Sequence, residues 1–98
     1  MMGSIPIGMK HECVVTADGS KFWYLNDKLS RTDGPAVEYA GGLKYWFLDN
    51  RYHRTDGPAI ERPDGTKKWF LLGEEYKDLK VFEAASTMLV ALFPEMGN

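Results

Sequence analysis

The chain has 98 residues, a formal net charge of -2 with both signs interspersed, and a single cysteine, Cys13. This length suits one small domain, and the balanced charge disfavours a generic nucleic-acid binder, because such binding needs a clustered positive patch. One cysteine excludes an internal disulfide and cannot by itself build a thiolate zinc site, so we expect neither a metal nor another cofactor.

The N-terminal stretch MMGSIPIGMK lacks the apolar run of a secretion signal. The longest apolar run near the C-terminus, Met88 to Phe93, is too short to span a bilayer. We therefore expect a soluble cytoplasmic protein with no membrane contact. Residues 1–98 are predicted to form one domain, with a flexible N-terminus at 1–9, a repeat region at 10–77 and a helix at 78–93.

A period of 23 residues dominates the chain, and Trp23, Trp46 and Trp69 keep it. The same spacing relates three further sets: Lys21, Lys44 and Lys67; Leu25, Leu48 and Leu71; Gly19, Gly42 and Gly65. The phrase RTDGPA stands at 31–36 and again at 54–59. Since such a period marks repeated units, each unit should have one structural meaning.

Each unit is predicted to be a β-hairpin followed by a short strand. KFWYL, KYWFL and KKWFL are aromatic-rich runs bounded by turn formers, which is typical of strands. Two-residue hairpin turns are expected at 26–27 and 49–50, with Gly73 in the matching place, and glycine turns at 40–42 and 63–65. The predicted fold class is mainly β (α+β): an antiparallel β-meander of hairpin repeats forming a single sheet, with one C-terminal helix packed on one face.

Two interpretations of RTDGPA are open. In the favoured one it is a structural turn with salt bridges, because aspartate accepts hydrogen bonds from nearby amides, glycine supplies unusual dihedrals and proline can begin a strand. The turn residues are Asp33, Gly34, Pro35, Asp56, Gly57 and Pro58. In the rival interpretation, a ligand-binding ladder is formed by Arg31, Asp33, Arg54 and Asp56.

Strand register follows from counting back from the glycine turns. Opposite-charge and small-against-large pairs then face each other. These pairs are Glu38 with Lys44, Glu61 with Lys67, Ala36 with Trp46, and Cys13 with Trp23. Cys13 is therefore predicted to be a small packing residue rather than a reactive thiol.

Alternation separates a Trp face, which carries Trp23, Trp46 and Trp69, from a nearly apolar Phe/Tyr face. The Phe/Tyr face comprises Val14, Phe22, Tyr24, Leu29, Val37, Tyr45, Phe47, Tyr52, Ile60 and Phe70. A helix of ~22 Å after the N-cap Asp78 is predicted to cover it. The residues expected on its packing side are Val81, Phe82, Ala85, Met88, Leu89 and Leu92.

The Trp face is then predicted to be an open contact surface, because tryptophan and arginine are enriched at interface hot spots. Its candidate binding residues are Trp23, Trp46, Trp69, Lys21, Lys44, Lys67, Arg51, His53, Glu38 and Glu61. The alternative is a purely structural ridge in which each indole lies flat on its Gly-Pro corner.

The stretches KFWYLNDKLSRTDGPAVE and KYWFLDNRYHRTDGPAIE, each leading to a glycine turn, resemble the MORN-like repeats of many small bacteriophage proteins. The similarity covers residues 13–77, with a truncated third unit. The resemblance implies single-layer β-hairpin arrays that bind other molecules and are generally not enzymes. Membrane-lipid binding is not expected, because DGPA replaces the G-x-G step that is common in MORN repeats. Binding to anionic lipids would also need a basic surface on the protein.

We do not expect an enzyme, because the sequence contains no known catalytic motif. His11, Glu12 and Cys13 are consecutive strand residues, and the side chains of adjacent strand residues point to opposite faces. We expect a non-enzymatic protein that docks on a host protein complex and inhibits or modulates it, as an anti-CRISPR or anti-restriction protein does, because the predicted surface is broad and flat. The alternatives are a small-ligand or nucleotide sponge and a purely structural assembly protein. A homodimer through the helix is a further expectation, because Ala84, Val90 and Ala91 add apolar area to its outer side.

Overall fold

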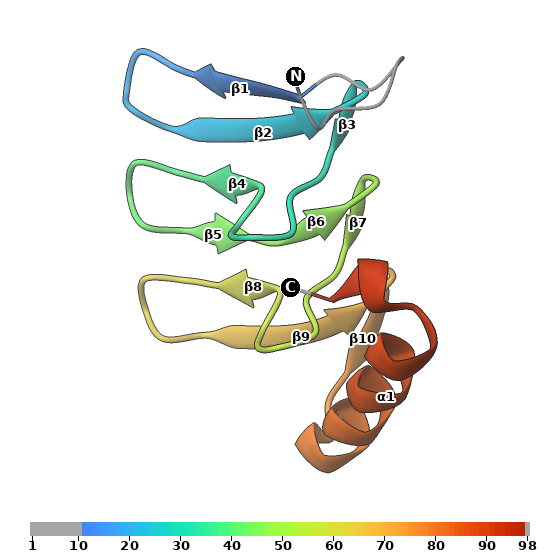
Figure 1. Cartoon of the computed structure of the whole chain (residues 1–98). Coiled ribbons are helices and arrows are strands. Elements are labelled where there is room, and N and C mark those ends of the chain that lie inside the picture. The colour runs from blue at the N-terminus through green and yellow to red at the C-terminus, as the bar shows by residue number, and fades with distance from the viewer. Residues whose placement is uncertain (1–10, 98) are drawn as a thin grey trace.

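The computed structural model describes residues 11–97, so the flexible segment predicted at 1–9 lies outside the described residues. Short strands and two helical segments follow one another along the chain (Figure 1). They are β1 (His11–Val15), β2 (Lys21–Leu25), β3 (Lys28–Leu29), β4 (Val37–Glu38), β5 (Lys44–Tyr45), β6 (Phe47–Leu48), β7 (Arg51–Tyr52), β8 (Ile60–Glu61), β9 (Lys67–Leu71), β10 (Glu74–Tyr76), α1 (Leu79–Leu92) and the 3-10 turn η1 (Pro94–Met96).

The strands form an antiparallel meander in the order β1-β2-β4-β5-β8-β9-β10, in which β3 also pairs with β2. The mainly β class with a C-terminal helix is thereby confirmed, although β6 and β7 form a two-stranded sheet beside the main one. The predicted register is also confirmed by the pairs Cys13–Trp23, Glu38–Lys44 and Glu61–Lys67.

Three tiers, one for each unit, stack on one another (Figure 1). Each tier ends in a two-residue hairpin turn with positive φ, as predicted for 26–27 and 49–50 and for Gly73, whose turn partner is Leu72 (φ 47°). Backbone bonds join successive hairpins: the Asn50 amide donates to the Leu29 carbonyl (2.8 Å), and the Gly73 amide to the Tyr52 carbonyl (2.8 Å). The 23-residue period is therefore a stacking period.

The C-terminal helix lies on the Trp face, and its predicted placement on the Phe/Tyr face is wrong. Tyr76 is directly opposite Trp69 in the β9–β10 hairpin, so the two side chains share a face. The ring of Phe82 in α1 meets that of Tyr76 at a centroid distance of 6.0 Å. Helix α1 therefore packs on the last tier instead of crossing the sheet.

The packing side of α1 is narrower than predicted. Phe82 and Ser86 are buried, whereas Val81, Met88 and Leu92 are 52%, 65% and 66% exposed. Asp78 caps the helix as predicted, accepting hydrogen bonds from the amides at positions 80 and 81. Within residues 11–97, no helix is long and apolar enough to cross a membrane.

The Phe/Tyr face is held together by its own rings rather than by a covering helix. Ring contacts with centroids 4.6 to 6.1 Å apart, mostly edge to face, link Phe22, Tyr39, Tyr45, Phe47, Tyr52 and Phe70. Such pairs add to the stabilisation that area burial gives. Partial burial also raises the pKa of the Tyr52 hydroxyl.

Candidate functional site

Both RTDGP segments leave the sheet opposite a tryptophan. The Trp23 carbonyl accepts from the Ser30 amide (3.2 Å), while the Trp23 amide donates to the Ala36 carbonyl (2.7 Å). The segment 31–35 therefore loops out of the return strand between two residues that bond to the same partner. The second unit repeats this at Trp46, with 54–58 as the loop. This excursion divides each return strand into two short ones.

The arginine of each loop folds back over that tryptophan. Arg31 Cζ lies 3.9 Å from the centroid of the Trp23 ring, and Arg54 Cζ lies 3.9 Å from that of Trp46. This is a cation–π contact, which is strongest over an indole. We call each such stack, with its loop, an arginine clamp.

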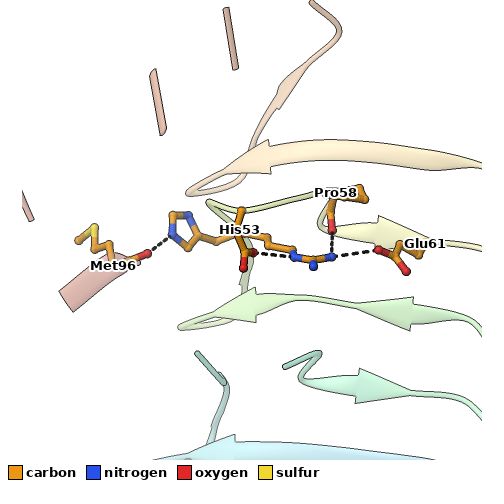
Figure 2. Close-up of polar contacts among 6 residues, drawn as sticks. His53, Pro58, Glu61 and Met96 are labelled. Carbon is orange, nitrogen blue, oxygen red and sulfur yellow. Dashed lines mark hydrogen bonds and ion pairs between the residues drawn. The ribbon is translucent and has the colours of Figure 1, made fainter. Parts of the chain in front are cut away.

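Each guanidinium is also bonded on its edges. Arg54 Nε donates to Asp56 Oδ1 (2.9 Å), and Arg54 Nη1 donates to the Pro58 carbonyl (3.1 Å) and to Glu61 Oε2 (3.0 Å), as Figure 2 shows in part. Arg31 makes the same set of contacts with Asp33, Pro35 and Glu38 at 2.9, 3.0 and 3.4 Å. The bond from Arg31 lowers the pKa of Asp33.

These contacts confirm the salt bridges expected in RTDGPA, but the aspartates accept from the arginine side chains rather than from the downstream amides that the sequence suggested. They also correct the expected charge pairing: the register is as predicted, but the ion pairs within residues 11–97 join Glu38 to Arg31 and Glu61 to Arg54. Both arginines pair with carboxylates of their own unit, which favours a structural role over the ligand-binding ladder.

The glycine of each DGP step is needed for close approach rather than for unusual dihedrals. The positive φ angles of glycines belong to Gly73 and the turns at 19, 42 and 65, and not to Gly34 or Gly57. A methyl group at Gly34 would lie 2.9 Å from Arg31 Cζ, and one at Gly57 would lie 2.7 Å from Arg54 Cζ. The guanidinium is thus packed between an indole and a bare Cα.

The residue before each arginine caps the hairpin of the next tier. The Asp49 amide donates to Ser30 Oγ (3.3 Å), and one unit later the Leu72 amide donates to His53 Nδ1 (3.0 Å). This fixes the neutral tautomer of His53, whose Nε2–H donates to the Met96 carbonyl (2.8 Å; Figure 2). Burial, opposed by the bond to Met96, lowers the pKa of His53.

The predicted binding residues do not form one open surface. Trp46 is only 7% exposed beneath its clamp and His53 only 1%, so neither can anchor a partner. Trp23, Trp69, Glu38 and Glu61 are half-buried. The residues that remain exposed are Lys21, Lys44, Lys67 and Arg51.

A hollow of about 970 Å³ lies beside Trp23 over the first two tiers. Its lining combines apolar side chains from the sheet with polar ones from the first RTD loop and from η1. The residues are His11, Glu12, Cys13, Trp23, Tyr24, Leu25, Asn26, Lys28, Ser30, Arg31, Thr32, Asp33, Leu48, Asp49 and Glu95. We call this the hollow.

Sequence reasoning missed most of the hollow. The 23-residue spacing relates Leu25 and Leu48 to Leu71 in the sequence. Nothing in the sequence predicts that Glu95 lies beside residues of the first tier. His11 and Cys13 are two positions apart in β1, so alternation places them on the same face, and both line the hollow. No hydrogen bond joins them in the described part of the chain.

The charge of the hollow is acidic. Asp49 and Glu95 bring exposed carboxylates to its lining and Lys28 one positive charge, while Asp33 pairs with Arg31 and Glu12 alternates to the other face of β1. Arg31 is already paired with carboxylates of its own unit. Three or more potential metal-ligating side chains do not gather anywhere in residues 11–97.

Comparison of the chain with protein-family models, with curated proteins and with solved structures gave no match. The MORN-like resemblance therefore rests on the repeated phrases alone, and the site is interpreted from its own geometry.

Proposed function

We propose that the protein is a non-enzymatic binding protein that docks on a host protein complex and inhibits or modulates it, with the hollow as its docking site. The observation that carries this proposal is the hollow itself. It is a concave part of the Trp face with apolar and polar side chains, and it lies beside the part on which α1 packs. The hollow is less flat than the surface that the sequence predicted, but its lining combines apolar side chains with a polar edge, which is the usual composition of protein interfaces. The phage-type role in the host cytoplasm comes from the MORN-like resemblance.

A binding role fits the chemistry of the residues better than catalysis does. The charged groups nearest the tryptophans are used to hold loops: Arg31 and Arg54 in the clamps, with Asp33 and Glu38 as partners. His53 uses both ring nitrogens in hydrogen bonds to the backbone. These groups build the rigid scaffold on which a contact surface depends.

The single cysteine gives a direct test, because Cys13 is exposed, not packed as predicted, and lines the hollow. Tagged protein is incubated with host lysate before and after alkylation of Cys13 with a bulky maleimide, and the captured proteins are compared. The Cys13→Ala variant is the matched control, since alanine holds the equivalent places at Ala36 and Ala59. We expect alkylation to abolish capture by the wild type and to leave capture by the variant unchanged. Capture that survives alkylation would refute docking in the hollow.

A small-ligand sponge is the second candidate, because 970 Å³ is close to the upper end of the ~300–1,000 Å³ range of small-molecule pockets. The acidic lining disfavours a nucleotide, whose phosphates need positive partners. A ligand recovered by mass spectrometry after denaturing the purified protein would favour this candidate. If neither a ligand nor a captured protein is found, a purely structural role is favoured.

A further inference from the structure

The C-terminal segment, α1 with η1, packs on part of the Trp face. In the third tier, Leu71 is buried, and Phe82 of α1 packs edge-on against the neighbouring Tyr76. In the second tier, the Met96 carbonyl in η1 accepts the Nε2–H of His53. The segment thus runs along this face from the last tier towards the first.

The hollow begins where that segment ends. Glu95, next to Met96, is the residue of η1 that lines it. By the 23-residue period, Leu25 and Leu48 are equivalent to Leu71, and both line the hollow. Among residues 11–97, an aromatic side chain of α1 packs on Tyr76 of the Trp face in the third tier, while Leu25 and Leu48 line the hollow in the first two.

Charge distinguishes the hollow from the covered part. Glu95 and Asp49 are exposed at its wall, and the arginine in its lining is paired within its own unit. An incoming basic group meets complementary charge there, whereas an acidic group meets repulsion. Lys28 is the one lysine of the lining.

We propose, resting on the function proposed above, that the hollow takes a protein segment which presents an aromatic side chain next to an arginine or lysine. The aromatic ring packs on the apolar side chains of Leu25 and Leu48 that line the hollow. The basic group lies against the carboxylates of Asp49 and Glu95. The segment continues the path of the chain's own C-terminus across the Trp face.

Three dipeptides test this chemistry without knowledge of the natural partner. N-acetyl-phenylalanyl-arginine amide is titrated into isotope-labelled protein, and shifts of the Trp23 indole N–H and of the Leu25 and Leu48 methyl groups are followed. The comparison probes are N-acetyl-phenylalanyl-glutamate amide, which reverses the charge, and N-acetyl-alanyl-arginine amide, which lacks the ring. We expect shifts confined to these groups, and about threefold to tenfold weaker binding of either comparison probe, given modest exposed ion pairs and one small apolar contact.

Variants separate the charge effect from loss of folding. Glu95→Lys should reduce binding of the phenylalanyl-arginine probe and improve binding of the phenylalanyl-glutamate probe. Glu75→Lys, an exposed change opposite Phe70 on the other face, should alter neither. Equal binding of the three dipeptides, shifts outside the hollow, or no response to Glu95→Lys would overturn the proposal.

This outcome can be told apart from failure of the proposed function. If Cys13 alkylation blocks partner capture but the dipeptides do not discriminate, docking in the hollow stands and the stated partner chemistry is wrong. If alkylation has no effect on capture while the arginine probe binds as expected, the hollow has the stated chemistry but is not where the captured complex docks.

Discussion

The arginine clamp predicts an energetic coupling between Arg54 and Gly57. In the wild type, Gly57→Ala would place a methyl group 2.7 Å from Arg54 Cζ and push the guanidinium off the Trp46 indole. A partly buried cation–π contact is worth about 1–2 kcal/mol, a hydrogen bond to the backbone about 1, and a half-exposed ion pair about 0–1. We therefore expect Arg54→Ala to cost about 2–4 kcal/mol of unfolding free energy and Gly57→Ala about 1–2 kcal/mol.

The test is a double-mutant cycle measured by urea unfolding, with indole fluorescence as the probe. Once Arg54 is alanine, the methyl group at position 57 has nothing to displace. The double variant should then be about as stable as Arg54→Ala alone. Arg31 and Gly34 form a second clamp in the same chain and should behave alike, with a smaller cost because Arg31 Nη1 lies 3.4 Å from Glu38. Additive costs at both clamps would refute the packing of the guanidinium against glycine.

Three further predictions concern other parts of the chain. Burial lowers the pKa of His53 in the folded state, so the free energy of unfolding should be highest above the unfolded pKa of about 6.5 and should fall below it by at most about 1.4 kcal/mol per pH unit. The variant His53→Ser, which places a serine where Ser30 stands in the first unit, should flatten this pH dependence in urea unfolding between pH 7.5 and 5. An unchanged slope would contradict the role given to His53. Lys44→Ala should cost only about 0–1 kcal/mol by the same assay, since Lys44 is exposed, and a loss above 2 would contradict this. Met88 is 65% exposed on a helix that is apolar nearly all round, and we propose that the protein self-associates through this helix. Light scattering at high concentration should detect the oligomer, and Met88→Glu should abolish it. A monomeric mass for the wild type would exclude self-association.

Sequence periodicity was enough to predict the strands and their register. Glu38 lies opposite Lys44 and Cys13 opposite Trp23 because the glycine turns fix the count and side chains alternate. The clamps were only half predictable. Trp23 and Arg31 share their spacing with Trp46 and Arg54, but the contact depends on a loop that leaves the strand opposite the indole.

The face covered by the helix could not be predicted from the helix itself. Apolar residues such as Val81, Phe82 and Val90 point in different directions around the helix, so periodicity does not select one packing side. The short link from Tyr76 to Leu79 decides it, because the helix must start beside the ring of Tyr76 on the Trp face. The placement of the helix also changes the candidate site. The C-terminal segment covers part of the Trp face, and the concave part beside it is the hollow.

The central claim is that the C-terminal segment lies on the Trp face and closes one side of the hollow. A nitroxide attached to Cys13 tests it most directly by paramagnetic broadening of backbone amide signals. We predict strong broadening at Leu48 and Glu95, which share the hollow with Cys13, and little at Glu75 on the opposite face. An unaffected Glu95 signal, with broadening at Leu48 retained, would contradict the claim.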